Sequence, residues 1–161
     1  MGTDGLDDST IRRVLTETRR IAVVGASNKP YRPSNGVMRF LIGQGYEVTP
    51  VNPGVAGQTI HGRTVVGNLQ DAAPLDMVDL FRASARVGPA IDEAIRLKAK
   101  VVWTQLGVID EEAAGRARRA GLIVVMDRCS AIEIPRLGLR RGLGTAVLRL
   151  EPPEGRATSV S

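Results

Sequence analysis

The sequence has very few residues that bind metals or form disulfide bonds. Its 161 residues include one cysteine, Cys129, and one histidine, His61. A single cysteine excludes an internal disulfide. One cysteine and one histidine are also too few to form a cluster of Cys and His ligands for a metal. We therefore expect neither a disulfide-stabilised domain nor a zinc site.

Aromatic residues are also scarce, at 3% of the chain, whereas apolar residues of all kinds make up 43%. The core must therefore be aliphatic, which suits a buried parallel sheet. The net charge of +5 and the pI near 10.1 raise nucleic-acid binding as one hypothesis. The lack of an aromatic platform for base stacking argues against it, and arginine on a solvated surface explains most of the charge.

Long hydrophobic runs are missing as well. No apolar segment approaches the length that crosses a membrane, and residues 1–10 are acidic and polar rather than basic and apolar. We therefore expect a soluble cytoplasmic protein without a signal peptide and without a membrane partner.

What the sequence does contain is a regular alternation of short apolar runs and amphipathic segments. This pattern predicts an α/β fold with a Rossmann-like, doubly wound, mainly parallel sheet and helices on both faces. A capped helix is expected from Ile11, after Asp8 and Ser9. The other expected helices are 36–44, 89–99, where Pro89 would occupy the first turn, and 110–120, and the expected strands are 21–24, 47–51, 64–66, 77–81, 101–105 and 123–126.

The length of the chain fits one domain. The alternating pattern is lost from Gly138 onward, where the sequence becomes irregular. We expect a single domain over residues 1–150 and a disordered tail over residues 151–161.

The loop after the first expected strand lacks the Gly-x-Gly-x-x-Gly spacing of dinucleotide-binding turns. It has Gly25, Ala26 and Ser27, followed by the cations Lys29 and Arg32. A glycine turn into a helix N-terminus can bind an anion without that spacing, and the two cations would suit several phosphates. A plain strand-to-helix turn with solvated cations is an equally good interpretation of this loop alone.

The loop after the second expected strand distinguishes between ligands. A NAD site has an acidic residue at the end of this strand, and an NADP site usually has an arginine nearby. Here the strand ends in Val51, Asn52 and Pro53, with neither acid nor base. The sequence therefore argues against a conventional nicotinamide site, although these residues alone also fit an ordinary turn.

Four segments at the ends of successive strands resemble one known family. The chain is similar to the small bacterial CoA-binding proteins, whose fold matches the CoA-binding domain of the succinyl-CoA synthetase α subunit. The resemblance covers about residues 11–135. The segments are AVVGASNKPYRPSNGVMRFLIGQGYEVTPVNP, VDLFR, VVWTQLG and VVMDRC.

This resemblance implies a coenzyme A site, with the CoA phosphates over the first loop and the nucleotide near the second. It also shows that the phosphoryl-carrying histidine of the synthetases has no counterpart, because their second domain is missing and His61 does not match by position. The contacts that the resemblance implies are Gly25, Ala26, Ser27, Lys29 and Ser34 in the first loop, Val51, Asn52 and Pro53 in the second, Phe81 and Arg82 in the third, and Gln105 and Gly107 in the fourth.

Cys129 is the remaining candidate for chemistry. It follows the last expected strand on the ligand side, next to Arg128 and before a possible short helix, which are features that favour a thiolate. A thiol contact with CoA is one hypothesis. A buried structural cysteine is the other, with Arg128 simply paired to Asp127.

The sequence thus favours non-catalytic binding of CoA or an acyl-CoA, as a carrier, sensor or regulatory module. An NAD(P)-linked oxidoreductase is the alternative from the enzyme class, but only Cys129, Tyr31 and Tyr46 could donate a proton. The identity of the acyl group and of any protein partner stays open. So does self-association, for which the small-residue helix 110–120 offers a surface.

Overall fold

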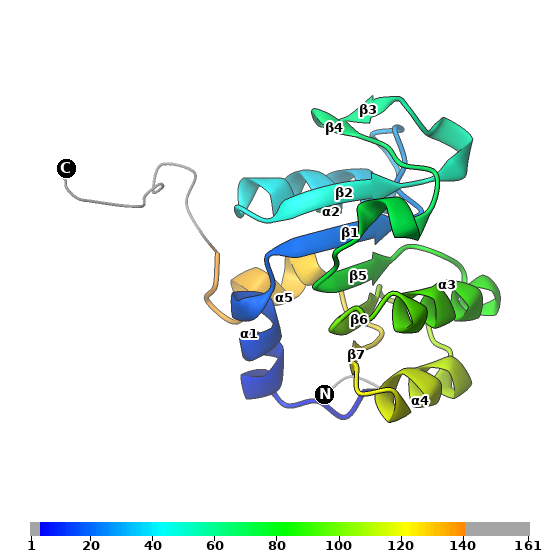
Figure 1. Ribbon diagram of the computed structural model, residues 1–161. Helices are drawn as coiled ribbons and strands as arrows, with labels where there is room; N and C mark the ends of the chain where they lie inside the picture. Colours follow the sequence, from blue (N-terminus) through cyan, green and yellow to red (C-terminus); the bar gives the residue numbers. More distant parts are fainter. Residues whose placement is uncertain (1–3, 141–161) are drawn as a thin grey trace.

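The computed structural model describes residues 4–140. The expected tail 151–161, and the end of the expected domain at residue 150, lie outside these residues. In chain order the elements are α1 (Asp8–Glu17), β1 (Arg20–Val24), α2 (Pro33–Gly43), β2 (Glu47–Val51), β3 (Thr59–Ile60), β4 (Arg63–Thr64), β5 (Met77–Leu80), α3 (Ser84–Arg96), β6 (Val101–Thr104), α4 (Glu111–Arg119), β7 (Ile123–Val125) and α5 (Ser130–Arg136), with 3-10 turns at Pro53–Val55 and Leu69–Ala72 (Figure 1).

Five parallel strands form the sheet in the order β2-β1-β5-β6-β7. The chain moves from β1 outward to β2, returns to the other side of β1 at β5, and then continues outward to β7. The strand order therefore reverses between β1 and β5, which is where ligands bind in open α/β sheets. The predicted Rossmann-like, parallel fold class is confirmed.

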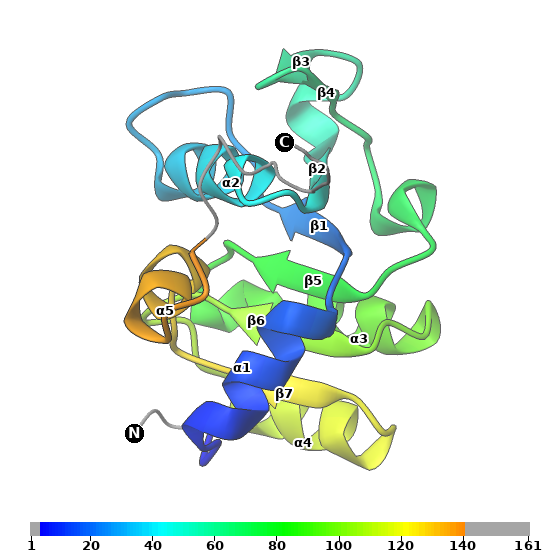
Figure 2. The same ribbon diagram turned by 90° about the vertical axis from the view of Figure 1, so that its left-hand side faces the viewer.

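Helices cover both faces of the sheet, and each face has its own aliphatic core. Figure 2 shows α2 and α5 on one side of the strands and α3 and α4 on the other. Alternate residues of each strand point to opposite faces. On β1, Val23 packs in the core with α1, α2 and α5, whereas Ala22 and Val24 pack in the core with α3 and α4.

Three helices begin before the predicted residue, and α1 and α2 begin three residues early. Helix α1 begins at Asp8 because the carboxylate of Asp7, rather than a residue at 8–10, accepts a hydrogen bond from the N–H of Thr10 at 2.9 Å. Helix α2 begins with Pro33 in its first turn, where a proline costs no hydrogen bond.

The predicted start of α3 at Pro89 was wrong, since the helix begins at Ser84 and the proline is its sixth residue. Val87 and Gly88 are buried in this first part of the helix, so packing outweighs the missing proline N–H, and Pro89 itself is exposed. With 13 residues α3 is the longest helix of residues 4–140, and none of these helices is long and apolar enough to cross a bilayer.

The predicted strand 64–66 is observed in part: Thr64 belongs to β4 of a two-stranded antiparallel hairpin, β3–β4, and Val66 forms an isolated parallel bridge with Val51. His61 and Gly62 form the turn of the hairpin with φ of +47° and +79°, the left-handed pair that a two-residue hairpin loop requires. The hairpin follows β2 and lies beside the loop between β1 and α2 (Figure 1). A hydrogen bond connects the two segments: Asn28 in the loop donates to Gln58, the residue before β3.

Candidate functional site

A cavity of about 650 Å³ opens at the carboxyl edge of the sheet, beside the point where the strand order reverses. Its walls come from the loops after β1, β2, β5 and β6, from the first turns of α2, and from the residue before α5. The lining residues are Gly25, Ser27, Lys29, Arg32, Pro33, Ser34, Val37, Asn52, Phe81, Arg82, Ala83, Gln105, Leu106, Val108 and Cys129.

Three cations line this cavity: Lys29, Arg32 and Arg82. Among residues 4–140, no Asp or Glu lines it, and none of the three cations forms an ion pair. Arg32 lies over the exposed ring of Tyr31, 5.8 Å from its centroid. The cavity is therefore positively charged and suited to an anionic ligand.

The backbone N–H groups of the first loop are largely occupied within the protein. Gly25 and Ala26 both donate to the carbonyl of Val51, at 3.0 and 3.3 Å. The N–H of Ser27 donates to the hydroxyl of Ser34, and the hydroxyl of Ser27 accepts from the N–H of Lys29, both at 3.1 Å. An anion here would therefore be held mainly by the cations and hydroxyls rather than by a nest of free N–H groups.

The next helix adds a favourable field to this loop. Helix α2 has no side-chain cap at Arg32 and no acidic residue in its first turn. Its N-terminal end, which carries the positive end of the helix dipole, borders the cavity through Pro33 and Ser34. The dipole and the three cations therefore favour the same sign of ligand charge.

Asn52 joins the ends of β1 and β2. Its side-chain amide donates to the carbonyl of Ala26 at 2.7 Å, and its carbonyl oxygen accepts from the N–H of Gly54 at 2.8 Å. Pro53 lines a neighbouring cavity of about 600 Å³ that shares Arg82 with the first. The two cavities therefore meet at Arg82, next to the strand reversal.

Gln105 is the most unusual polar residue of the cavity. Its side chain is 7% exposed, and its Oε1 has no hydrogen-bond partner among the described residues. A buried acceptor without a donor costs free energy, so a ligand that brings an N–H or O–H group would relieve that cost.

The predicted residues fall into two groups. Those that line the cavity are Gly25, Ser27, Lys29, Ser34, Asn52, Phe81, Arg82, Gln105 and Cys129. Those that do not are Ala26, which is buried, Val51 and Pro53, which line the neighbouring cavity, and Gly107, whose N–H donates to Asp127 at 2.6 Å.

The contact set implied by the resemblance omitted six lining residues. Only Arg32 carried a signal in the sequence, namely its charge beside Lys29. The others are apolar residues that enter the lining through the packing of their elements, and no motif marks them. The six are Arg32, Pro33, Val37, Ala83, Leu106 and Val108.

Cys129 lines the cavity, half-buried, as the residue before α5. The expected pairing of Arg128 with Asp127 was wrong. Arg128 bonds Asp4 through two nitrogens, each at 2.9 Å, and Glu133 at 3.2 Å, and its hydrogen bonds to Asp4 raise the pKa of the guanidinium. Its charge is thus neutralised by these carboxylates and is not reserved for the thiol of Cys129.

His61 contacts the site only indirectly. Its Nε2 lies 3.0 Å from both the backbone oxygen and the side-chain oxygen of Asn35, whose amide donates to the carbonyl of Ser27 at 2.9 Å. The only histidine of the chain therefore connects the hairpin to Asn35 of α2, which in turn bonds the first loop. It does not line the cavity.

The sequence did not indicate that the carboxyl of Asp79 is buried. It has no solvent exposure, lies on β5 between Met77 and Phe81 on the face that packs against α5, and has one hydrogen-bond partner, the hydroxyl of Ser130 at 3.4 Å. Burial raises the pKa of Asp79 to about 8, and the bond from Ser130 offsets only part of this. The carboxyl is therefore mostly protonated at neutral pH.

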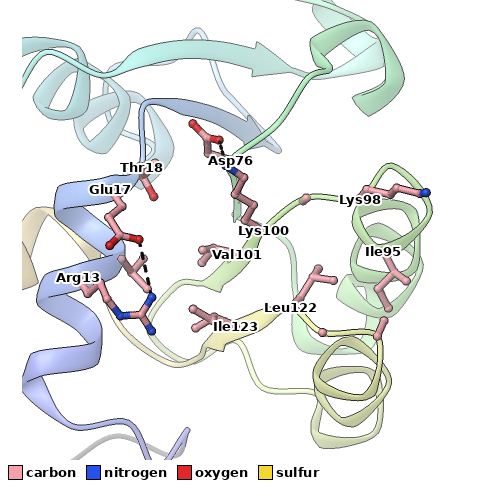
Figure 3. A pocket seen from close by; sticks show the side chains of 14 residues that line it. Arg13, Glu17, Thr18, Asp76, Ile95, Lys98, Lys100, Val101, Leu122 and Ile123 are labelled. Carbon is pink, nitrogen blue, oxygen red and sulfur yellow. Dashed lines mark ion pairs between the residues drawn. The ribbon is translucent and has the colours of Figure 1, made fainter.

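A cavity of about 670 Å³ lies at the opposite, amino-terminal edge of the strands (Figure 3). Its charged side chains are partly paired, Arg13 with Glu17 and Lys100 with Asp76. Burial would raise the pKa of Asp76, but hydrogen bonds from the N–H groups of Arg20 and Arg19 outweigh it and lower that pKa. This cavity lies away from the strand reversal and has mixed charge, so the carboxyl edge is the better candidate site.

The CoA binding domain family matches residues 19–135, and the chain belongs to this family. It is 36% identical over 120 residues to the uncharacterized protein YneT of Bacillus subtilis (strain 168), covering 74% of this chain and 87% of YneT. A hypothetical protein from Pyrococcus horikoshii OT3 matches with 41% identity and a TM-score of 0.79, covering 85% of this chain and 96% of that one.

A further solved structure, cell-free ID.343 from Thermus thermophilus, matches with 37% identity and a TM-score of 0.78, covering 82% of this chain and 99% of that one. A complex of RSP with β-NAD+ and operator DNA matches at only 16% identity, with a TM-score of 0.51 over 80% of this chain and 59% of that one. This last likeness shows the fold alone. The family therefore identifies the chain as a nucleotide- or CoA-binding module, whereas the fold by itself does not select the ligand.

Proposed function

We propose that this protein reversibly binds coenzyme A or an acyl-CoA in the cavity at the carboxyl edge of its sheet, and that it acts as a carrier, sensor or regulatory module. The observation that carries the proposal is the charge of the cavity: among the described residues, three cations without ion pairs line it and no carboxylate does. CoA brings a pyrophosphate and a ribose phosphate, which need such a surface.

The order of the strands supports one direction for the bound molecule. Asn52 follows the edge strand β2, the cationic loop follows β1, Arg82 follows β5, and Gln105 follows β6. A ligand lying across these ends would place its nucleoside near Asn52, its phosphates between Lys29 and Arg82, and its amide-containing arm near Gln105. Its acyl or thiol end would then face the apolar residues Phe81, Leu106 and Val108, with Cys129 beside them.

The residues available favour binding without catalysis. Within residues 4–140, the cavity has no carboxylate and no histidine that could transfer a proton. The nicotinamide alternative has less support, because β2 ends at Val51 and is followed by Asn52 and not by the acidic residue that holds the ribose of NAD. Nucleic-acid binding would need base-stacking aromatics, which are rare here.

Calorimetry with a series of ligands tests the proposal. The purified chain, kept reduced, should bind CoA more tightly than dephospho-CoA, and pantetheine more weakly than either, because each loses phosphate contacts. NAD and NADP should give little or no heat. Binding of NAD without binding of CoA would overturn the proposal and favour the oxidoreductase alternative.

A ligand that remains bound through purification gives a second test. Its mass under native and denaturing conditions would show whether the protein carries free CoA or an acyl derivative. We further propose that the protein acts in the cytoplasm. It would act there as a monomer, as a homo-oligomer or in complex with another protein. Sedimentation with and without CoA would distinguish these states.

A further inference from the structure

Cys129 lies at the end of the ligand path described above. It follows β7, the last strand of the sheet, and lines the same cavity as Lys29 and Arg82. Its side chain is half-buried, so the sulfur borders the cavity without being sealed in the core. It is also the single cysteine of the whole chain.

Gln105 provides an independent sign that an extended polar ligand passes this way. Its Oε1 is buried without a partner among residues 4–140, in the wall of the cavity and directly after β6, the strand next to β7. Neighbouring strands lie only about 5 Å apart. The arm of CoA carries two amide N–H groups between its phosphates and its thiol, so a donor to Gln105 would direct the thiol toward Cys129.

The geometry points to a covalent use of this arrangement, which rests on the proposed function: Cys129 forms a mixed disulfide with the sulfur of CoA when the protein meets CoA disulfide. The thiolate of Cys129 attacks one sulfur of the CoA disulfide, and the bond between the two CoA sulfurs breaks. One CoA stays bound through the new sulfur–sulfur bond. The other leaves as a thiolate and takes up the proton that Cys129 released.

The absence of a second cysteine determines how long the product lasts. In dithiol proteins a neighbouring cysteine attacks the mixed disulfide and releases the small thiol. This chain has no such residue at any position. The adduct therefore persists until an external thiol attacks it, and the protein would change from reversible to covalent binding as the CoA pool becomes oxidised.

Selectivity in this scheme comes from the phosphate end of the ligand and not from the sulfur. Arg128 is next to Cys129 but is bonded to Asp4 and Glu133, so it does not serve the thiol. Docking of the nucleotide on Lys29 and Arg82 raises the local concentration of the disulfide beside Cys129. Disulfides without phosphates lack this advantage.

The test is the rate of adduct formation, followed by intact mass, for the reduced full chain with three disulfides. CoA disulfide should give one adduct of one CoA at a rate at least about ten-fold that of pantethine or glutathione disulfide. Cys129→Ser should give none. Lys29→Ala and Arg82→Ala should slow the reaction with CoA disulfide more than the reaction with pantethine, which has neither phosphate nor charge.

Two results would overturn the inference. One is equal rates for the three disulfides, which would show a merely accessible thiol. The other is no adduct in the native protein while the urea-unfolded chain reacts, which would show that Cys129 is packed away. Calorimetry of the reduced wild-type chain with CoA separates this from the proposed function: heat of binding without an adduct removes only the disulfide, and no heat removes the binding proposal itself.

Discussion

Asp79 has no solvent exposure on the central strand β5, and its Oδ1 has no hydrogen-bond partner among the described residues. Because burial raises its pKa to about 8, folding holds a proton that the unfolded chain releases near pH 3.8. The folded state therefore binds more protons than the unfolded state between about pH 4 and pH 8. The contribution of Asp79 to stability is fully present below pH 4 and is lost as the pH rises through 8.

We predict that Asp79→Asn flattens this dependence. In the wild type, the contribution of Asp79 should make the free energy of unfolding fall by about 1.4 kcal/mol for each pH unit inside that window. Urea titrations at pH 5, 6 and 7 measure it. Asp71→Asn, which removes an exposed carboxyl, serves as the control and should keep the wild-type slope. A slope in Asp79→Asn equal to that of the wild type would contradict the raised pKa.

Arg82 is the cation common to two cavities, and it should carry a large share of the affinity for CoA. A charge-assisted hydrogen bond contributes roughly 1.5–3 kcal/mol, so Arg82→Ala should weaken CoA about ten-fold or more. If Arg82 faces the 3′-phosphate, the substitution should weaken the binding of dephospho-CoA less than that of CoA. If Arg82 faces the pyrophosphate, it should weaken the binding of both ligands by the same factor.

The matched control for Arg82 is Arg39→Ala, which removes an exposed arginine of α2 that lines neither cavity. Calorimetry should show its CoA affinity within about two-fold of the wild type, since a distant surface charge acts only through a screened field. Equal losses in the two variants would mean that the net charge of the surface, and not a contact at Arg82, attracts the ligand.

Single residues were only partly predictable. Gly25, Ser27 and Asn52 could be chosen because each belongs to a short motif at the end of a strand, and all three line the cavity. Val37 and Leu106 could not, because apolar side chains give no local signal that they face a cavity instead of the core. Asp79 was visible in the sequence, but its burial depends on the packing of α5.

At the scale of elements, the turn from β1 into the α2 loop depends on Gly25. Its φ is +84°, and a Cβ there would lie 2.5 Å from the carbonyl oxygen of Phe81. Gly25→Ala should therefore lower the free energy of unfolding by about 2 kcal/mol or more, from the left-handed backbone and the clash with Phe81, directly after β5, together.

The contrast to that substitution is Gly36→Ala within α2. A Cβ at Gly36 meets no atom within 4 Å, and its φ is not in the left-handed region. Because alanine has a higher helix propensity than glycine, the free energy of unfolding of this variant should rise by about 0.5–1 kcal/mol. Urea denaturation of both variants measures the difference, and a loss of stability in Gly36→Ala would refute the assignment of space around it.

The strands were predicted more accurately than the helix starts. Predicted strand ends lie within one residue of the observed ends for β1, β2, β5, β6 and β7, because short apolar runs bounded by polar loops mark buried strands. The start of α3 was placed five residues late because Pro89 is locally a helix-start signal. The burial of Val87, a tertiary contact, decides the true start and cannot be read locally.

At the scale of the whole molecule, the alternation of strands and helices predicts a parallel sheet but not the order of its strands. The return from β2 across β1 to β5 creates the strand reversal, and with it the cavity that combines loops far apart in the sequence. The ion pairs that close the fold were equally hidden. Asp4 and Arg128 are separated by 124 positions, and no local pattern joins them.

Asp4 should therefore be a large determinant of global stability. Its carboxylate has no exposed surface, accepts two hydrogen bonds from Arg128, and also accepts from the N–H of Met126 at 3.0 Å. Removing one member of a buried pair leaves the other charge poorly compensated, which costs about 3–5 kcal/mol. Glu133 still faces Arg128, so Asp4→Ala should lose about 3 kcal/mol, at the lower end of that range.

The control and the pH dependence distinguish this closing contact from ordinary surface charge. Asp8→Ala breaks the exposed pair with Arg136, which solvent screens, and should cost much less stability than Asp4→Ala. Burial tends to raise the pKa of Asp4, but hydrogen bonds from Arg128 outweigh it and lower that pKa below its usual 3.8. The stability from Asp4 is then present above about pH 4 and decreases as the pH falls below it, so the difference between Asp4→Ala and the wild type should shrink in acid; a difference that does not change as the pH is lowered from neutral into acid would contradict the ion pair as its cause.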